Sequence, residues 1–393
     1  MHQLNALLGM PQHRFASIHV VGTNGKSSTT RMTAALLQGH GLRTGTCVSP
    51  HSERWSERVL IGDEEIGPAE FAAAVERAAA AAETLNRRLP EGEVVTQFEL
   101  ATAATFVALA GARVEVAVIE AGLGGRLDAT NTIPSRVAVL TSVGLDHTEW
   151  LGESEEEIAA EKLAVLRDHS TLVVGRVSDA VRSLAERVAA ERGAKLVIAA
   201  DDPGPDLSLT APGRFQRRNF ALACEAAKAF LGRELDGDVV SAVAASIRLP
   251  GRLERVGDEP PVFLDAAHNP DGAAALAEAL PGLAAGRPVV ACIAVLREKD
   301  AAAMVRALAP AVECVVCTEV SIARPALSAS ELAAQCKEAG IVAEAEPDFA
   351  AAVGRGRSLA AERDGILVVA GSHYALAPAR EALRSVRGSQ RRI

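Results

Sequence analysis

The segment Gly22–Ser28 brings together residue types that bind phosphate. Gly22 and Gly25 let backbone N–H groups turn toward a ligand, and Lys26 supplies a positive charge for phosphate oxygens. A helix that begins near Ser27 would add the partial positive charge of its N-terminus. These residues predict a phosphate-binding loop, and a glycine turn with a surface lysine is the alternative that they leave open by themselves.

The residues on either side of this segment predict the elements that a phosphate loop needs. Residues 16–21 are rich in β-branched side chains and predict a strand, while apolar residues recur at helical spacing from Met32 to Leu37. Val20 stands where the standard Walker pattern has its first glycine, so the shorter Gly-x-x-Gly-Lys-Ser remains. A strand, a glycine turn and a helix in this order favour the phosphate-binding interpretation.

Three polar residues stand where other predicted strands end, namely Ser49, Glu120 and His147. Ligands bind outside the carboxyl ends of the strands in doubly wound sheets. A hydroxyl, a carboxylate and an imidazole beside a phosphate loop suggest a magnesium–nucleotide site, and the imidazole leaves manganese open. Ser49 can also be a turn residue before a proline, whereas an acid that ends a buried apolar strand, as Glu120 does, seldom serves packing.

A second group of polar residues follows the strand predicted at 262–264. Asp265 and His268 lie where a new helix begins, and Asn269 with Pro270 is a good helix start by itself. Because a helix cap needs only one of these residues, we predict that Asp265 and His268 are functional.

Composition narrows the class of protein. The formal net charge of −9 gives no basic surface for nucleic acid or for an anionic membrane. No apolar run approaches the ~20 residues of a membrane span, and no leader pattern opens the chain, so we expect a cytoplasmic protein. The six cysteines are interpreted as core thiols, including Cys314 and Cys317, whose spacing also occurs in redox pairs.

Length and the alternation of predicted strands and helices indicate two α/β domains. The 393 residues exceed one average domain, and the alternation predicts parallel sheets covered by helices. Pro250 and Gly251 interrupt the first series. We therefore expect a P-loop-containing, mostly parallel ATPase domain over residues 1–249 and a smaller Rossmann-like α/β domain over residues 250–393.

Motifs along nearly the whole chain resemble those of bacterial folylpolyglutamate synthases, often also dihydrofolate synthases, within the Mur ligase superfamily. The glycine-rich string from Glu120 to Asn131 is the most specific of them. In chain order the motifs are Gly22-Thr-Asn-Gly-Lys-Ser-Ser-Thr29, Ser49-Pro-His51, Glu120-Ala-Gly-Leu-Gly-Gly-Arg-Leu-Asp-Ala-Thr-Asn131, Gly144-Leu-Asp-His-Thr-Glu-Trp-Leu-Gly152, Glu161-Lys162, Phe215-Gln216 with Asn219, Pro250-Gly-Arg252, Asp265-Ala-Ala-His-Asn-Pro-Asp-Gly272 and Gly371-Ser-His-Tyr374.

The resemblance implies roles for individual residues. It implies that ATP is bound by Gly22, Thr23, Asn24, Gly25, Lys26, Ser27, Ser28, Asn219, Arg252 and Asp265. It implies Ser49, Glu120, His147 and Lys162 as ligands of Mg²⁺ or Mn²⁺, and Lys26, Lys162 and His268 as catalytic residues. Lys162 matches the lysine that the family carbamylates, whereas by itself it reads as a solvated helix lysine beside Glu161.

The reaction that the resemblance implies joins L-glutamate to a folate. ATP phosphorylates the acceptor carboxylate, and the amine of glutamate attacks the acyl phosphate. The resemblance also implies small-molecule substrates as partners, a monomer, and a closure of the second domain that brings Arg252 and Asp265 to the nucleotide.

Two other functions stay open. One is a Mur-superfamily ligase that joins an amino acid to a different carboxylate, and the other is a nucleotide-binding switch without amide chemistry. A cell-wall Mur ligase is disfavoured because little chain precedes Gly22. The chain departs from the family pattern at Ser27, where the family has glycine, and over residues 52–58, so the sequence leaves the acceptor open.

Overall fold

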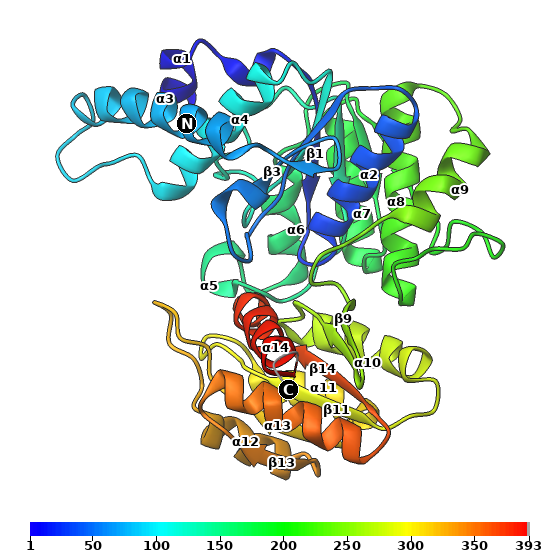
Figure 1. Ribbon diagram of the computed structural model, residues 1–393. Helices are drawn as coiled ribbons and strands as arrows, with labels where there is room; N and C mark the ends of the chain where they lie inside the picture. The colour runs from blue at the N-terminus through cyan, green and yellow to red at the C-terminus, as the bar shows by residue number, and fades with distance from the viewer. Residues whose placement is uncertain (391–393) are drawn as a thin grey trace. The chain divides into compact units, whose positions relative to one another are not determined.

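The computed structural model describes residues 1–390, and side chains as far as residue 384. The chain forms two compact units (Figure 1). The first comprises Met1–Thr210 and Gln216–Ile247, and the second comprises Ala211–Phe215 and the residues from Arg248 onward. The short segment 211–215, which we had placed in the first domain, therefore clusters with the second unit.

An eight-stranded sheet in the order β4-β3-β2-β5-β1-β6-β7-β8 forms the centre of the first unit. All neighbouring pairs from β2 to β8 are parallel, and β3 and β4 add an antiparallel edge. The central strand β1 lies between β5 and β6, so the chain leaves it at a switch point of the topology. The strands are β1 (Ala16–Val21), β2 (Thr44–Cys47), β3 (Val59–Ile61), β4 (Glu64–Glu65), β5 (Val116–Glu120), β6 (Val137–Leu140), β7 (Thr171–Val174) and β8 (Lys195–Ile198).

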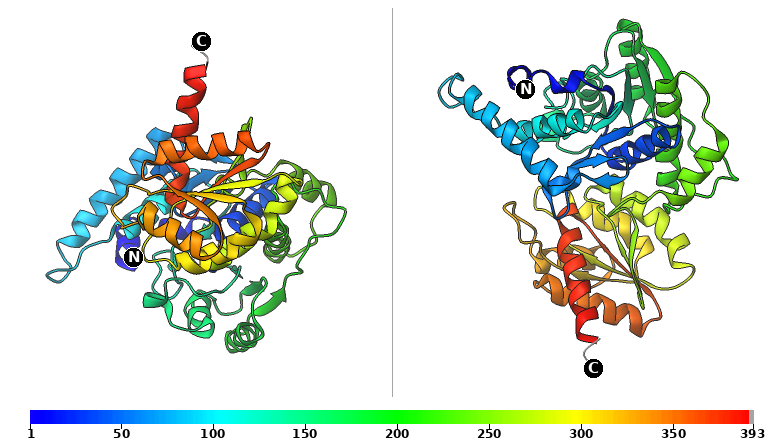
Figure 2. Two further views of the ribbon diagram at one scale, coloured as in Figure 1. Left: turned by 90° about the horizontal axis from the view of Figure 1, so that it is seen from below. Right: turned by 45° about the horizontal axis from the view of Figure 1, so that its top comes forward.

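Helices cover both faces of this sheet. Apolar residues of α3, α4, α6 and α7 pack on one face, and α2 packs against β2 and β5 and contacts α9. Figure 2 shows the long helices α3 and α4 side by side, in light blue and cyan. The helices are α1 (His2–Leu7), α2 (Lys26–Gly39), α3 (Pro68–Asn86), α4 (Gln97–Gly111), α5 (Thr148–Leu151), α6 (Glu155–Leu163), α7 (Asp179–Glu191), α8 (Arg214–Leu231) and α9 (Gly237–Ser246).

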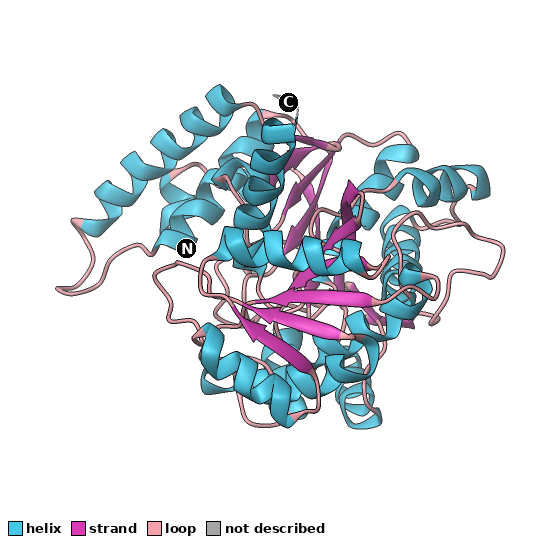
Figure 3. Cartoon of the chain, turned by 60° about the horizontal axis from the view of Figure 1, so that its bottom comes forward, coloured by secondary structure: helices cyan, strands magenta, loops and turns pink. Residues whose placement is uncertain are grey.

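The second unit is a smaller α/β fold around a six-stranded sheet in the order β13-β12-β11-β14-β10-β9 (Figure 3, strands in magenta). Only β9 is antiparallel. Helices α10, α11 and α12 pack on one face, and α13 and α14 on the other. The elements are β9 (Glu254–Asp258), β10 (Pro261–Leu264), α10 (Pro270–Ala284), β11 (Val289–Ile293), α11 (Ala301–Leu308), β12 (Cys314–Cys317), α12 (Ala329–Glu338), β13 (Val342–Ala345), α13 (Phe349–Glu362), β14 (Ile366–Ala370) and α14 (Leu376–Gln390).

The predicted fold class is confirmed, because both sheets are mostly parallel and covered by helices. The sequence did not predict the short antiparallel strands β3, β4 and β9, nor the helices α5 and α14. All six cysteines are buried and free, as expected for core thiols. Among the helices within residues 1–390, none is long and apolar enough to cross a membrane.

Candidate functional site

The phosphate loop connects β1 to α2, and its two glycines have no room for a side chain. Gly25 caps α2 with φ of +83°, and a Cβ there would lie 2.5 Å from Oδ1 of Asn219. Gly22 has φ of +151°, and a Cβ there would overlap the hydroxyl of Thr141. Both positions combine a positive φ with close packing, so the loop requires glycine at each of them.

Hydrogen bonds to the segment after β6 hold the loop in place. The N–H of Thr23 donates to the carbonyl of Ser142 (2.8 Å), and the N–H of Gly144 donates to the Thr23 hydroxyl (3.1 Å). The hydroxyl of Thr141 donates to the carbonyl of Asn24 (2.6 Å), and the Asn24 N–H donates to Oγ of Ser142 (3.0 Å). The neighbouring loop thus fixes the backbone that would face a phosphate.

Lys26 folds back over the loop. Its Nζ donates to the carbonyl oxygens of Gly22 (3.0 Å) and Thr23 (3.1 Å). These are neutral acceptors, so anionic phosphate oxygens would bind the ammonium group more strongly.

Glu120 joins the phosphate loop to the end of β2. Its carboxylate is 2% exposed; Oε1 accepts from the Ser27 hydroxyl (3.0 Å) and Oε2 accepts from the Ser49 backbone N–H (3.0 Å). Ser27, Ser49 and Glu120, all predicted as site residues from the sequence, are therefore in direct contact.

Lys162, in the last turn of α6, contacts the phosphate loop at Gly22. Its Nζ donates to the carbonyl oxygens of Gly22 (3.0 Å) and Leu123 (3.1 Å), and the residue is 2% exposed. Burial and the nearby positive charge of Lys26 lower the pKa of Lys162 to about 7. The interpretation of Lys162 as a solvated surface lysine is therefore wrong.

The glycine-rich loop after β5 caps the C-terminus of α6. The N–H of Arg126 donates to the carbonyl of Glu161 (3.1 Å), and Nε of Arg126 pairs with the Glu161 carboxylate (3.0 Å). A Cβ on Gly125 would lie 2.5 Å from the carbonyl oxygen of Glu161 and 2.7 Å from that of Lys162. The close approach that glycine permits sets the distance between this loop and Lys162.

His147 lies in the segment after β6, with φ of +53° just before the short helix α5. Its ring nitrogens lie 3.9 Å from the Asp146 carboxylate and 4.0 Å from that of Glu149. The link between Gly144 and Thr23 connects this segment to the phosphate loop.

Two further predicted residues line the loop from the helical side. Asn219 on α8 donates from Nδ2 to Oε1 of Gln216 (3.0 Å), and its Oδ1 faces the α-carbon of Gly25. Ser28 lies in the first turn of α2 and is 2% exposed.

The segment that departs from the family pattern, residues 52–58, carries a stack of ring and guanidinium groups. The rings of His51 and Trp55 have centroids 4.5 Å apart, and the Arg58 guanidinium lies 4.5 Å from the centroid of the Trp55 ring. Nε of Arg58 donates to Nδ1 of His51 (3.0 Å). Burial and the charge of Arg58 lower the pKa of His51.

In the second unit, Asp265 follows β10 and shapes the turn around it. Its Oδ1 accepts from the N–H of Ala267 (2.8 Å), and Oδ2 accepts from the N–H of Leu253 (2.9 Å). Burial raises the pKa of Asp265, while the positive charge of Arg252 and the two N–H groups oppose that shift. Asp265 and Arg252 are therefore close enough to interact electrostatically.

His268 and Asn269 follow on the same turn. Nδ1 of His268 lies 2.9 Å from the carbonyl of Ala266, which cannot donate, so this nitrogen carries the proton. Oδ1 of Asn269 accepts from the N–H of Gly272 (2.8 Å) and caps α10. Asn269 thus makes the helix start, and His268 is not needed for it.

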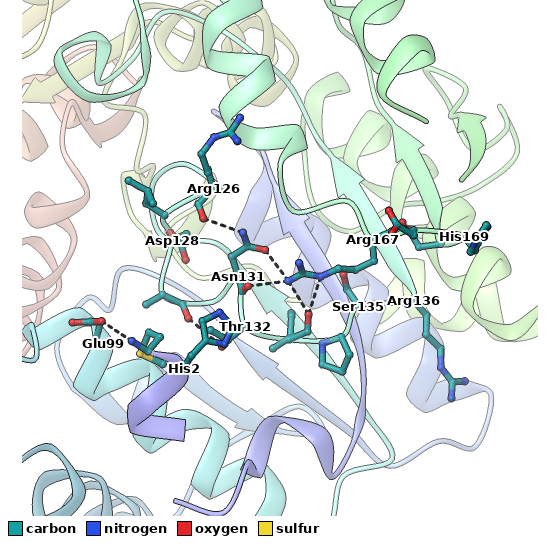
Figure 4. A pocket seen from close by; sticks show the side chains of 17 residues that line it. His2, Glu99, Arg126, Asp128, Asn131, Thr132, Ser135, Arg136, Arg167 and His169 are labelled. Carbon is teal, nitrogen blue, oxygen red and sulfur yellow. Dashed lines mark hydrogen bonds and ion pairs between the residues drawn. The ribbon is translucent and has the colours of Figure 1, made fainter. Parts of the chain in front are cut away.

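A pocket of about 1030 Å³ opens beside the glycine-rich loop in the first unit (Figure 4). Asp128 lines it and holds the loop together, because Oδ2 accepts from the N–H of Leu123 (3.0 Å). Arg167 donates to carbonyl oxygens of Asn131 (2.8 Å) and Ile133 (3.1 Å) on the wall. The pocket is lined by Met1, His2, Glu99, Arg126, Leu127, Asp128, Ala129, Asn131, Thr132, Ile133, Pro134, Ser135, Arg136, Arg167, Asp168, His169 and Ser170.

The structure brings five of the predicted residues together around the phosphate loop, namely Lys26, Ser27, Ser49, Glu120 and Lys162. Arg252, Asp265 and His268 lie together on the second unit. Sequence reasoning did not single out Thr141, Ser142, Leu123 or Asp128, although the last two stand inside the most specific motif.

The donor set around Glu120 fits one class of metal ion. In the described part of the chain, no three His, Cys, Asp or Glu side chains gather into a metal-binding cluster. Mg²⁺ uses one or two carboxylates and completes its octahedron with phosphate oxygens and water. One buried carboxylate with Ser27 at the start of α2 and Ser49 after β2 suits that ion and not an ion that needs a full protein cage.

Two family models match the chain: the Mur ligase middle domain over residues 20–207 and the Mur ligase, glutamate ligase domain over residues 251–373. The chain is 36% identical over 353 residues to the dihydrofolate synthase/folylpolyglutamate synthase of Mycobacterium tuberculosis, covering 79% of this chain and 72% of that protein. The class defined by fold and site is thus that of the Mur ligases.

Solved structures agree with the sequence matches. The folylpolyglutamate synthase of M. tuberculosis complexed with ADP superposes with a TM-score of 0.90 at 33% identity, over 97% of this chain and 93% of that one. The bifunctional folylpolyglutamate synthase/dihydrofolate synthase of Yersinia pestis complexed with AMPPNP and Mn ion gives 0.83 at 29% identity, over 97% and 92%. The chain belongs to the folylpolyglutamate synthase family of Mur ligases, which confirms the resemblance found in its motifs.

Proposed function

We propose that this chain is an ATP-dependent amide ligase that adds L-glutamate to a folate by way of an acyl phosphate. The observation that carries this proposal is the convergence of Lys26 and Lys162 on the carbonyl oxygen of Gly22. A switch that only binds a nucleotide has no need for a second, buried lysine at the mouth of its phosphate loop. The names of its relatives support the same reaction.

The phosphate loop and Lys26 would act on the transferring phosphoryl group. The N–H groups at the start of α2 bind phosphate oxygens, and Lys26 leaves the carbonyls of Gly22 and Thr23 to offset negative charge. The acceptor carboxylate attacks the γ-phosphorus and ADP leaves; the glutamate amine then attacks the acyl carbon, forms the amide and releases phosphate. No side-chain nucleophile is needed, so positioning carries the rate.

The bound nucleotide would be accompanied by Mg²⁺, with Mn²⁺ as a substitute. Glu120 would hold the ion, with Ser49 and His147 as further ligands and Ser27 beside it. The ion would supply positive charge that offsets the negative charge of the phosphate groups. Glu120 orients that charge because its two oxygens are already fixed from two different elements.

Lys162 would be carbamylated by carbon dioxide, as its match to the family lysine suggests. The ammonium group first loses one proton; the neutral amine then attacks the carbon of CO₂ and loses a second proton, so a cation becomes a carbamate anion. Next to Lys26 this change replaces a repulsion by an attraction, since both side chains reach the same carbonyl oxygen. The carbamate oxygens would then be available to a metal ion.

The remaining predicted residues would bind ATP or assist the amide step. Asn219 packs against Gly25 and would contact the nucleotide beside the loop. Arg252 and Asp265 would bind ATP, with Asp265 holding the turn that carries Arg252. His268, whose Nδ1 contacts the carbonyl of Ala266, would assist the amide step.

The pocket beside the glycine-rich loop is the candidate for the folate-type acceptor. It is large enough for a drug-sized ligand. Its wall begins at Arg126 and Asp128, on the same loop whose Leu123 carbonyl contacts Lys162. A monomeric state and a cytoplasmic location stay predictions.

A panel of carboxylate acceptors tests the proposal. The purified chain is incubated with ATP, Mg²⁺ and labelled L-glutamate, together with dihydropteroate, tetrahydrofolate or non-folate carboxylates, and both ADP and labelled amide are measured. We expect both products only with a folate-type acceptor. A non-folate acceptor would favour the other Mur-superfamily ligase, and ADP formed without any acceptor would favour the switch.

A further inference from the structure

His19 is a buried histidine in the middle of β1, three positions before the phosphate loop. It is 0% exposed, and its Nε2 lies 2.8 Å from the hydroxyl oxygen of Thr130. Burial lowers the pKa of His19 to about 4, with the charge of Asp128 opposing and that of Arg167 adding to the shift. The ring is therefore neutral at physiological pH, and one of its nitrogens carries no proton.

The contacts of Thr130 determine which nitrogen of His19 carries the proton. The hydroxyl of Thr130 lies 2.6 Å from Oδ1 of Asp128, and its single proton goes to that carboxylate. The same hydroxyl can then only accept from His19, so Nε2 is the protonated nitrogen. Nδ1 of His19 is buried and has no hydrogen-bond partner among the described residues, which agrees with this tautomer.

The hydrogen bonds continue from Asp128 to the phosphate loop. Oδ2 of Asp128 accepts from the N–H of Leu123 (3.0 Å), and the carbonyl of Leu123 accepts from Nζ of Lys162 (3.1 Å). Nζ of Lys162 also donates to the carbonyl of Gly22 (3.0 Å), the residue that follows β1. This series of hydrogen bonds thus begins at His19 on β1, passes through the glycine-rich loop and ends at Gly22, the residue after β1.

We propose that His19 is a positioning residue: through Thr130 and Asp128 it fixes the glycine-rich loop, and through Leu123 it fixes the position of Lys162. This inference rests on the proposed function, in which Lys162 takes part in ligation. His19 itself touches neither nucleotide nor acceptor, so its effect passes entirely through the loop.

The physical basis is that His19 and Thr130 are both fully buried, while Asp128 is half-buried at the wall of the pocket. A hydroxyl that loses its donor in a dry interior cannot replace it by water. The loop would then be held at Asp128 by the N–H of Thr130 but no longer by its hydroxyl, and the Leu123 carbonyl, one of the two acceptors of Lys162, would be less firmly placed. Residues that orient ligands in this way commonly change activity by about 10-fold or more when they are substituted.

Thr130→Val is the principal test, because it removes the hydroxyl at nearly constant volume. We expect kcat of acceptor-dependent ADP formation to fall about 10-fold, with KM for ATP little changed. Hydrogen exchange of the 122–131 peptide should accelerate. Thr130→Ser, which keeps the hydroxyl, should restore kcat.

Thr105→Val is the matched control. Thr105 is buried in α4, and its hydroxyl donates to the carbonyl of Ala101 (2.9 Å) in the same helix. We expect this change to lower the unfolding temperature and to leave kcat of the folded enzyme unchanged. If Thr130→Val behaves in the same way, with a lower melting point and full kcat, the positioning role is wrong.

Variants of His19 provide an independent test. His19→Gln keeps an N–H donor at a similar reach, and His19→Leu keeps volume but removes the donor; we expect full or partial kcat in the first and about 10-fold loss in the second. Combining His19→Leu with Thr130→Val should cost no more than either alone, since both break one series of bonds. Additive losses would overturn the proposal. An inactive wild type would instead contradict the proposed function.

Discussion

Glu120 and Asp265 are both buried acids at the carboxyl end of a parallel strand, yet they differ in what they hold. Glu120 accepts hydrogen bonds from residues 93 and 71 positions away in the sequence. Asp265 accepts from backbone N–H groups only 12 and 2 positions away. The first acid joins separate elements at the phosphate loop, whereas the second shapes the turn in which it lies.

This difference shows that a buried acid at a strand end can connect separate elements at a binding site, as Glu120 does, or can stabilise its own turn, as Asp265 does. Ser27 donates to Glu120 through a hydroxyl group, which can rotate about its side-chain bond. The partners of Asp265 are backbone N–H groups, which the fold fixes in place. The first unit therefore brings together the residues that we propose for phosphoryl transfer, and the second holds Arg252 and His268 close to the turn that Asp265 shapes.

Lys26→Ala should show the largest effect and tests the assignment of phosphoryl transfer to the first unit. Loss of the ammonium group removes charge stabilisation of the transferring phosphoryl group, and we expect kcat for acceptor-dependent ADP formation to fall about 1000-fold. Lys195→Ala, at an exposed position of β8, is the charge-matched control and should retain activity. Substantial turnover by the Lys26 variant would contradict the assignment.

The paired substitutions Glu120→Gln and Asp265→Asn test the comparison directly. Glu120→Gln removes the anionic ligand, so we expect about 100-fold lower kcat and a higher Mg²⁺ requirement. Asp265→Asn places an amide N–H against a backbone donor and should cost about 1–3 kcal/mol of unfolding free energy, with a smaller effect on kcat. Magnesium titrations and thermal unfolding measure the two effects. If both variants required the same Mg²⁺ concentration, the proposed difference between Glu120 and Asp265 would be wrong.

The strand, the turn and the helix of the predicted phosphate loop are present in the structure, because their signals in the sequence are local. A strand, a glycine turn and Lys-Ser define the loop, and the acid after a buried strand points to Glu120. The fold class follows from the alternation of strands and helices. The short antiparallel strands β3, β4 and β9 escape prediction because two to five residues carry no periodicity.

The rest of the site depends on contacts that no local pattern encodes. The local sequence around Lys162 predicts a surface lysine, because its burial depends on the distant glycine-rich loop. Only the family resemblance indicated that Lys162 belongs to the site. His19 reads as one more strand residue, since its partner Thr130 lies 111 positions away. The turn of Asp265 was predicted as a functional cluster, but its hydrogen bonds to Ala267 and Leu253 also make it structural.

Gly125→Ala tests whether the spacing of the glycine-rich loop controls Lys162. A new Cβ would lie 2.5 Å from the Glu161 carbonyl, so loop and helix must separate. We expect about 10-fold lower kcat, because Lys162 loses its fixed position. Gly111→Ala, in α4 with no atom within 4 Å of the new Cβ, should leave kcat unchanged and stabilise the helix. Steady-state kinetics of both variants provides the comparison.

The smallest predicted effect is a pH response of opposite sign in the two units. The pKa of His19 falls from 6.5 unfolded to about 4 folded, so its stabilisation is present above pH 6.5 and is lost as the pH falls toward 4. Between pH 7 and pH 5 the first unit should lose about 2 kcal/mol relative to a His19→Gln variant. The raised pKa of Asp265 acts the other way, because its stabilisation is present at low pH and is lost as the pH rises.

Tryptophan fluorescence separates these two responses, because both tryptophans, Trp55 and Trp150, lie in the first unit. Thermal unfolding followed by this signal should show a lower midpoint at pH 5 than at pH 7, and the shift should shrink by several degrees in His19→Gln, as expected for about 2 kcal/mol in a unit of this size. Hydrogen exchange of β10 and β14 reports the second unit, which should not lose protection through Asp265. An identical pH shift in wild type and His19→Gln would mean that the buried ring does not titrate on unfolding.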